Sequence, residues 1–339
     1  TLRHSSAASD VYKRQGYLLP WGQMSYWGAQ VIINLFTTIP FIGPELGVWI
    51  RGDFAISDPT LTRFFALHIV AVPMVILLLV ILHLAALHTV GSNNPDGVEI
   101  KKYKDENGVP LDGVPFHPYY TVKDFVGIGV FLFLFSTTVF FMPEMGGYFL
   151  EHANFIPANP LVTPEHIAPV WYFTPFYSIL RAIPDPAFGA LAMALSIVVL
   201  FFLPWIDNNP IKSIRYRSML FRINLFVFVA GFLILGYLGV KAPTPLYSAL
   251  ALRFSEMYFI FFALLFFYSK SRGNFFSYIF AGSMISLITI YDLTRINFEN
   301  YILIITGLSL VCAFILFMTI SPLYTNLNEE KEVPERVTG

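Results

Sequence analysis

RFFALHIVAVPMVILLLVILHLAALHTVGSNNP, residues 63–95, decides the class of this protein, because its central part is apolar enough to lie in lipid. A spanning helix needs roughly 20 mainly apolar residues, and residues 64–87 meet that requirement. The same stretch carries His68, His83 and His88. Ionisable side chains inside a membrane are costly and point to function by default, so the three imidazoles require an explanation.

The overall composition agrees with a membrane protein. Of 339 residues, 56% are hydrophobic and only 13% are charged, whereas a soluble domain is about 25% charged. The net charge of −1 argues against a nucleic-acid partner. Cys312 is the only cysteine, which excludes a disulfide framework, a cysteine-ligated metal site and covalent haem attachment. Any haem must therefore be held without a covalent bond to the chain.

Apolar runs along the chain predict an all-α fold, a polytopic transmembrane helix bundle with about seven spanning helices. The predicted spans are 64–87, 124–143, 187–206, 221–240, 247–268, 275–293 and 301–320. Proline and glycine interrupt the regions 16–60 and 144–186, which predicts short helices lying at the membrane interface there.

The distribution of basic residues predicts the orientation of the bundle. Cytoplasmic loops of membrane proteins carry an excess of Lys and Arg. Here the excess falls on the loop 88–123, the connection 207–221 and the C-terminal tail. We therefore expect loop 88–123 in the cytoplasm and loop 144–186 outside.

The spacing of the histidines indicates how they are used. His68 and His83 are fifteen residues apart, which on an α-helix is about 1500° of rotation, so they lie within roughly 60° of one face and about 22 Å apart. Pro73 lies between them and can bend the helix. A neutral imidazole is a good axial ligand of haem iron. Spacing alone leaves two alternatives open: histidines hydrogen-bonded to neighbouring helices, and a path for protons or metal ions.

Several long motifs carry a resemblance to a known family. They are GYLLPWGQMSYWGAQV at 16–31, the RFFALH stretch from 63, PFHPYYTVKD at 115–124 and NPLVTPEHIAPVWYFTPFYSILRAIP at 159–184. In this order they resemble the cytochrome b family of the ubiquinol–cytochrome c reductase, respiratory complex III, and its bacterial members most. The resemblance runs from Gly16 to about Tyr268 and covers roughly the last two thirds of a family member. The first helices of the family, which carry the other axial histidine of each haem, have no counterpart here.

The resemblance implies two non-covalent b-type haems, each receiving one axial ligand from this chain. His68 resembles a ligand of the low-potential haem iron on the outer side, and His83 a ligand of the high-potential haem iron on the cytoplasmic side. Arg63 resembles the arginine that pairs with a haem propionate, although an arginine at a helix end can also be an interfacial anchor. The usual spacing in mitochondrial-type members is fourteen, whereas fifteen resembles the photosynthetic relatives.

An outer quinol site is implied by Pro169, Val170, Trp171 and Tyr172, together with Gly28. The family usually has a glutamate where Val170 stands, and that glutamate is thought to accept a proton from quinol. Valine cannot do so, and Glu165 and Tyr172 are the nearby candidates for this role. Alternatively, these aromatic residues form an interfacial belt, and Gly28 is a helix-packing glycine.

An inner quinone site is implied by four polar residues on the cytoplasmic side: His88, Ser92, Lys123 and Asp124. A His and an Asp beside the two carbonyls of a quinone can deliver the two protons that accompany two electrons, and Lys123 could relay protons from water. Asp124 could instead be an acidic residue that stabilises the start of the next helix.

The function implied by the resemblance is that of a quinol–cytochrome c oxidoreductase, active only in its multi-subunit complex. Quinol would be oxidised outside, quinone reduced inside, and protons translocated. The implied partners are a Rieske iron–sulfur protein, a c-type cytochrome, quinone, the lipid bilayer and a second copy of the complex, in a bacterial inner membrane. Two rivals remain: a cytochrome b-like subunit of a photosynthetic or menaquinol-using complex, and a non-redox proton-coupled transporter.

The resemblance also suggests a domain organisation. Residues 1–15 are polar and are interpreted as a non-native scar. Residues 16–100 would be the remnant of the N-terminal haem-binding domain, 101–123 the cytoplasmic loop and 124–268 the C-terminal domain. Residues 269–339 form an extension of two helices and a tail for which the resemblance implies no role.

Overall fold

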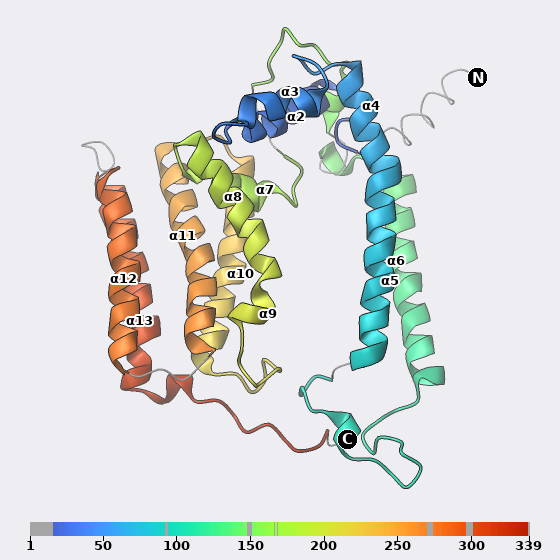
Figure 1. Ribbon diagram of the computed structural model, residues 1–339, viewed down its shortest axis with the longest axis vertical. Helices are drawn as coiled ribbons and strands as arrows, with labels where there is room; N and C mark the ends of the chain where they lie inside the picture. The colour runs from blue at the N-terminus through green and yellow to red at the C-terminus, as the bar shows by residue number, and fades with distance from the viewer. Residues whose placement is uncertain are drawn as a thin grey trace. The chain divides into compact units, whose positions relative to one another are not determined.

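The computed structural model describes residues 16–91, 94–147, 151–165, 167, 169–269, 274–295 and 301–337. These residues are predominantly helical and contain no β-strand, only two isolated bridges, Gly22 with Pro157 and Lys104 with Pro110 (Figure 1). The predicted all-α class is therefore confirmed.

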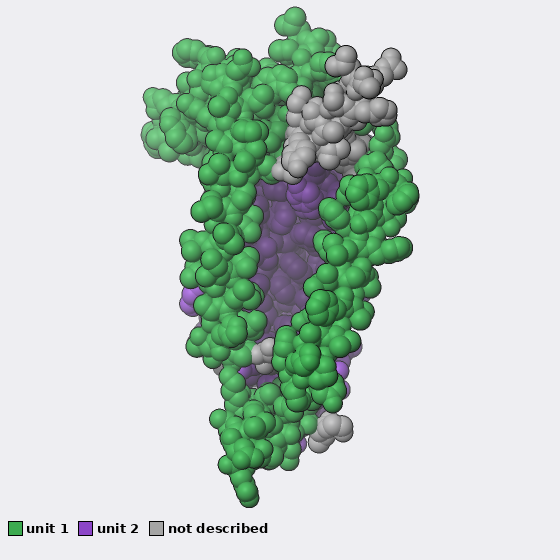
Figure 2. Space-filling view, turned by 90° about the vertical axis from the view of Figure 1, so that its right-hand side faces the viewer, with its two compact units in different colours: residues 1–94, 98–167, 334–339 green, residues 95–97, 168–333 purple. Residues whose placement is uncertain are grey.

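The chain divides into two compact units, coloured separately in Figure 2. Unit 1 comprises residues 1–94, 98–167 and 334–339, and unit 2 comprises residues 95–97 and 168–333. The helices of unit 1 are α2 (Gln23–Thr37), α3 (Gly43–Arg51), α4 (Asp58–Ala66), α5 (Val72–Val90) and α6 (Thr121–Phe141), with the π-turns η1 (Leu67–Ala71) and η3 (Phe116–Tyr120) and the 3-10 turns η2 (Ile100–Lys102), η4 (Met145–Gly147) and η5 (His152–Phe155).

The helices of unit 2 are α7 (Thr174–Ala182), α8 (Pro186–Phe201), α9 (Leu203–Ile206), α10 (Met219–Val240), α11 (Pro245–Tyr268), α12 (Asn274–Leu293) and α13 (Tyr301–Ile320). Two 3-10 turns follow, η6 (Ser321–Leu323) and η7 (Asn326–Asn328).

Six helical stretches of the described chain are long and apolar enough to cross a membrane: Asp58–Val90, Phe116–Phe141, Met219–Val240, Pro245–Tyr268, Asn274–Leu293 and Tyr301–Leu323. The remaining predicted span, 187–206, is divided into α8 and the four-residue α9. Pro204 explains the division, because it has no N–H to continue the helix and stands in the first turn of α9. The protein is thus a multi-pass membrane protein.

Short helices occur where proline and glycine interrupt the sequence. α2 and α3 fall in the region 16–60, and α7 falls in the region 144–186. α4 begins with a capping box, in which the Ser57 N–H donates to Thr60 Oγ1 at 3.2 Å. Pro59 follows in the first turn, where a missing N–H costs nothing.

Unit 2 is built around α11, which is apolar on all sides and contributes eleven buried residues. The Thr244 side chain caps its start by accepting a hydrogen bond from the Tyr247 N–H at 3.2 Å. One core cluster joins Leu220 of α10 and Leu264 of α11 to Ala281 of α12 and Ile315 of α13. The two extra helices of the extension therefore share a core with α10 and α11.

An ion pair inside unit 2 also joins the extension to α11. Arg253 donates to Asp292 at 2.6 Å and to Glu256 at 2.9 Å. Arg253 is 8% exposed and Asp292 is fully buried. Removing one member of a buried pair leaves a charge without its partner, which is more costly than replacing both members by apolar residues.

We expect Asp292→Ala to lower the free energy of unfolding by about 3–5 kcal/mol, the usual cost of breaking a buried pair. The reason is that Arg253 stays buried and keeps only Glu256. Thermal and denaturant unfolding of the purified protein in detergent measure the effect. Glu329→Gln, an exposed acid in the tail, serves as the control and should change stability by less than about 0.5 kcal/mol. If Asp292→Ala lowered the free energy of unfolding by less than about 1 kcal/mol, the ion pair would not stabilise the packing of the extension on α11.

Candidate functional site

The helix that carries the histidines contains a π-turn. α4, η1 and α5 form one continuous helix from Asp58 to Val90, and His68 lies within η1. The Val72 N–H donates to the Leu67 carbonyl, five residues back, instead of the fourth residue back. Pro73 follows directly and explains the turn, because its ring would otherwise collide with the carbonyl four residues earlier.

The π-turn changes the angle between His68 and His83. A π-turn holds one residue more than an α-turn. Fifteen residues that include it therefore correspond to fourteen α-helical steps, or about 1400°, which places the two imidazoles within roughly 40° of one side and about 21 Å apart. The π-turn accommodates the one residue by which this chain exceeds the usual family spacing. His83 is therefore rotated relative to His68 as it would be on a regular α-helix with the histidines fourteen residues apart.

His68 borders an apolar cavity of about 330 Å³. Tyr17, Ala29 and Phe64 line the same cavity. Gly16 lies so close that an added Cβ would come within 3.3 Å of the imidazole Cγ, so the glycine leaves room beside the ring. His68 is half-buried and has no hydrogen-bond partner among the described residues.

His83 and His88 lie on α5, which has no buried residue within the described chain. Both are exposed, and neither has a hydrogen-bond partner in that part of the structure. His68 and His83 stand on an apolar helix, and a neutral imidazole is a good axial ligand of haem iron, so each residue has the chemistry of one such ligand.

Arg63 lies in the last turn of α4. Its guanidinium donates to the carbonyl of Trp49, and it lines an apolar cavity of about 720 Å³ with Trp49 and Leu67. The residue is exposed, so its remaining N–H groups can reach an anionic group at this end of the helix.

The loop after α6 is anchored to α2 by side chains. Asn154 Oδ1 accepts hydrogen bonds from the Ser25 N–H at 2.8 Å and from Ser25 Oγ at 3.0 Å. Gln23 Oε1 accepts from the Asn159 N–H at 2.7 Å, and Trp27 Nε1 donates to the Asn159 carbonyl at 3.2 Å. The segment 151–159 is therefore held in a fixed position on α2.

Gly28 packs against Tyr17. A Cβ added to Gly28 would lie 2.8 Å from Tyr17 Cε1, inside contact distance. The glycine therefore lets an aromatic ring from the preceding turn approach the backbone of α2 directly. The Tyr17 hydroxyl in turn donates to Glu151 Oε2 at 2.9 Å. Sequence reasoning missed this pair, because 134 residues separate its members and no local pattern connects them.

The predicted outer motif forms the turn before α7 in unit 2. The Phe173 N–H donates to the Val170 carbonyl at 2.9 Å, and Thr174 Oγ1 donates to the Trp171 carbonyl at 2.6 Å. Trp171 and Tyr172 are 52% and 62% exposed and meet edge to face, with ring centroids 5.6 Å apart. Their rings are available to an apolar ligand.

The other outer candidates, Pro169 and Glu165, differ in their surroundings. Pro169 is half-buried. Glu165 lies in unit 1, is exposed and has no hydrogen-bond partner among the described residues.

The predicted inner residues are only partly brought together. Lys123 and Asp124, at the start of α6, line one shallow cavity with Tyr120 and Phe131, and Lys123 Nζ lies 6.0 Å from the centroid of the Tyr120 ring. His88 does not line that cavity. Ser92 lies outside the described residues.

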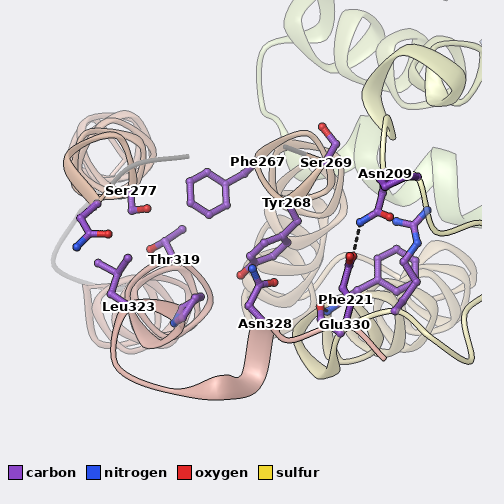
Figure 3. Close-up of a pocket in the computed structure, with 15 residues that line it drawn as sticks. Asn209, Phe221, Phe267, Tyr268, Ser269, Ser277, Thr319, Leu323, Asn328 and Glu330 are labelled. Carbon is purple, nitrogen blue, oxygen red and sulfur yellow. Dashed lines mark hydrogen bonds between the residues drawn. The ribbon is translucent and has the colours of Figure 1, made fainter. Parts of the chain in front are cut away.

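A polar cavity of about 580 Å³ lies elsewhere in unit 2, where α10 and α12 begin and α11 and α13 end (Figure 3). Asn209 Nδ2 donates to Glu330 Oε1 at 2.5 Å on one side of it. Arg217, which also lines it, is already paired with Asp207 through two hydrogen bonds of 3.0 and 2.9 Å. The cavity contains none of the residues predicted for either quinone site, and the extension supplies much of its wall.

Comparisons with known families cover most of the chain. A model described as cytochrome b (N-terminal)/b6/petB matches residues 12–175. A second, described as cytochrome b (C-terminal)/b6/petD, matches residues 157–259. The matched residues end before α12 and α13.

Comparisons with individual proteins also find similarity to cytochrome b. The chain is 54% identical over 264 residues to cytochrome b of Allochromatium vinosum, covering 75% of this chain and 63% of that protein. It is 52% identical over 245 residues to cytochrome b of Rickettsia prowazekii, covering 72% and 58%. A solved structure titled hyperthermophilic respiratory complex III contains a chain that aligns with a TM-score of 0.68 and 36% identity, covering 75% of this chain and 65% of that one. The chain thus spans about three fifths of the length of these curated relatives.

Proposed function

Because the chain belongs to the cytochrome b family, we propose that it acts as the haem b subunit of a quinol–cytochrome c oxidoreductase. The observation that carries the proposal is the pair His68 and His83. They stand on one continuous apolar helix, about 21 Å apart and within roughly 40° of one side, and neither imidazole has a partner among the described residues.

His68 and His83 would each supply one axial ligand to a b-type haem, His68 to the low-potential and His83 to the high-potential haem iron. Arg63, one turn before His68, would pair with a propionate of the low-potential haem. When bound, such haems carry single electrons across the membrane. The exposed apolar surface of α5 supports this proposal, because a cofactor and the helices carrying the second ligands would cover that surface.

Two quinone sites complete the proposal. At the outer site, Pro169, Val170, Trp171 and Tyr172 would bind the quinol ring. The family resemblance implies Gly28 as a further quinol-binding residue. Glu165 and Tyr172 are the sequence-based candidates for proton acceptance. At the inner site, His88, Ser92, Lys123 and Asp124 would bind quinone and deliver protons to it. Proton release outside and uptake inside would conserve energy as a proton gradient.

The proposed assembly is a multi-subunit complex in a bacterial inner membrane. It would include a Rieske iron–sulfur protein, a c-type cytochrome and a second copy of the complex. The neighbour titled respiratory complex III favours this assembly over a photosynthetic one. Identification of the extracted quinone and of the acceptor cytochrome would separate the respiratory complex from a menaquinol-using one.

A reduced-minus-oxidised spectrum of membranes containing the protein tests the proposal. We expect a b-type α-band that titrates in two potential steps, and quinol-dependent reduction of a c-type cytochrome. A non-redox transporter predicts no such band. Absence of the band would reject the proposal.

We expect His88→Ala to keep both haems and to slow quinone reduction at the inner site by roughly 100-fold, the lower range for loss of a proton-transfer group. The rate at which added quinone reoxidises the reduced b haems measures this step. His117→Ala is the control, because His117 lies in the loop before α6, where Nδ1 is 3.3 Å from Thr121 Oγ1. Equal rates in both variants would remove His88 from the inner site.

A further inference from the structure

In unit 2, two acidic side chains share one basic partner. The guanidinium of Arg253 on α11 donates to Glu256 Oε2 at 2.9 Å and to Asp292 Oδ1 at 2.6 Å. The Glu256 side chain is only 12% exposed, and Asp292 is fully buried. One guanidinium therefore serves two carboxylates inside a membrane protein, where a charge without its partner is costly.

Each of the two carboxyl groups leaves one oxygen without a hydrogen bond. Glu256 Oε1 and Asp292 Oδ2 are buried, and neither has a partner in the described part of the chain. Buried polar atoms are nearly always paired, so these two oxygens require an explanation. A bound proton provides one, because it removes the negative charge in excess of Arg253. It also turns one carboxylate into a group with an O–H donor, which the other carboxylate can accept.

Other titratable groups lie near this cluster, on or after α12 and on α13. Arg295 lies close to Glu256, but its guanidinium stands over the Tyr291 ring at 5.5 Å, and it donates to neither of the two unpaired oxygens. The Tyr291 hydroxyl is itself buried without a partner in the described chain. Cys312 lies near both acids and is hydrogen-bonded to Thr289. None of these groups therefore pairs with the two free carboxyl oxygens among the described residues.

Three packed helices hold the arginine and both acids in position. Arg253 and Glu256 stand one turn apart on α11, and Asp292 lies near the end of α12. A Cβ added to Gly307 of α13 would lie 2.8 Å from Arg253 Cδ, so the backbone of α13 packs directly against the arginine. The two acids are therefore kept beside the same guanidinium by the packing of the extension on α11.

We propose that Glu256 holds a proton at neutral pH, while Asp292 remains the ionised partner of Arg253. Asp292 is the more buried acid and accepts the shorter hydrogen bond, as expected for a charge-assisted pair. The small exposed part of the Glu256 side chain lets it exchange a proton with water. In that exchange an O–H bond forms on the Glu256 carboxylate, which becomes a carboxylic acid, and no electron is transferred. This proton site is independent of the quinol chemistry proposed above.

Infrared difference spectroscopy of the purified full chain in detergent tests the proposal directly. An exposed glutamate is ionised at pH 7, so a C=O band of a protonated carboxylic acid at that pH reports a buried acid. We expect such a band in the parent protein, shifted in D₂O and lost completely in Glu256→Gln. Glu329→Gln in the exposed tail and Cys312→Ala beside the cluster are the controls, and both should keep the band.

The pH dependence of folding gives a second, independent measurement. If the folded chain holds a proton that the unfolded chain has released, stability falls as the pH rises. The folding equilibrium constant of the parent should then fall, relative to that of Glu256→Gln, by up to about tenfold per pH unit between about pH 5 and 9. The glutamine amide is neutral at every pH, so the variant should fold as well as the parent at the acidic end and lack this dependence. Denaturant unfolding at each pH measures the difference.

Absence of the acid band from the folded parent at pH 7 would overturn the proposal, because buried water would then satisfy the two oxygens. A band that persists in Glu256→Gln but disappears in Asp292→Asn would place the proton on Asp292 and overturn the assignment. The same pH dependence in the parent and in Glu256→Gln would also overturn it. If Glu256→Gln does not fold, isotope labelling of the glutamate carboxyl carbons in the parent replaces it, and a band that does not shift on labelling would contradict the proposal.

Discussion

Replacing His68 by alanine is expected to abolish the low-potential haem signal and to reduce quinol oxidation to background. The imidazole has no other partner in the described chain, and alanine cannot ligate iron, so the second ligand alone would have to hold the cofactor. Redox titration of the α-band in membranes measures the loss. His83→Ala should remove the high-potential signal instead.

Ile69→Ala is the matched control for His68→Ala. Ile69 is the next residue in the same π-turn and is 48% exposed, so its truncation should leave both haem signals unchanged. If the haem content of His68→Ala equalled that of Ile69→Ala, the ligand assignment would be wrong.

Deleting Val70 from the π-turn is expected to leave both haems in place, although it shortens the distance in sequence between the two histidines. The deletion removes the one residue that the π-turn holds in excess. The helix can then continue as a regular α-helix with fourteen steps from His68 to His83. The rotation between the two histidines is therefore the same as before the deletion. Reduced-minus-oxidised spectra and redox titration are the measurements.

Deleting Leu78 instead is the matched test, because it also leaves the two histidines fourteen positions apart in sequence. The π-turn is retained in this variant, so only thirteen α-helical steps remain. His83 is then rotated by about 100° from its former direction. We expect loss of the high-potential haem signal with retention of the low-potential signal, which also reports that the protein still folds. Identical spectra from the two deletions would contradict the compensating role of the π-turn.

Hydropathy located six of the seven predicted membrane spans in the described chain. In lipid every backbone N–H and C=O must be satisfied within the segment, so an apolar run of sufficient length has little choice but to form a helix. The runs at 221–240, 247–268 and 301–320 agree closely with α10, α11 and α13. The run at 187–206 was less informative, because hydropathy does not register the missing N–H of Pro204, which divides it.

The candidate site was predictable only where its chemistry is carried by single residues. His68, His83 and their spacing are visible in the sequence, as is the absence of an acid at Val170. The π-turn around His68 was not predicted, since an α-helical periodicity was assumed throughout. The grouping of Lys123 with Asp124 follows from their adjacency, whereas the relation of His88 to them stays a prediction.

The sequence by itself determined the all-α class, most of the helix positions and the histidines that a haem would require, because each depends on residues within one helix. Only the tertiary structure decided which distant side chains meet. Tyr17 reaches Glu151 across 134 residues, and Arg253 reaches Asp292 across 39. Such pairs depend on how helices and loops pack, and the pattern of residues along one segment carries no information about the segment that packs against it.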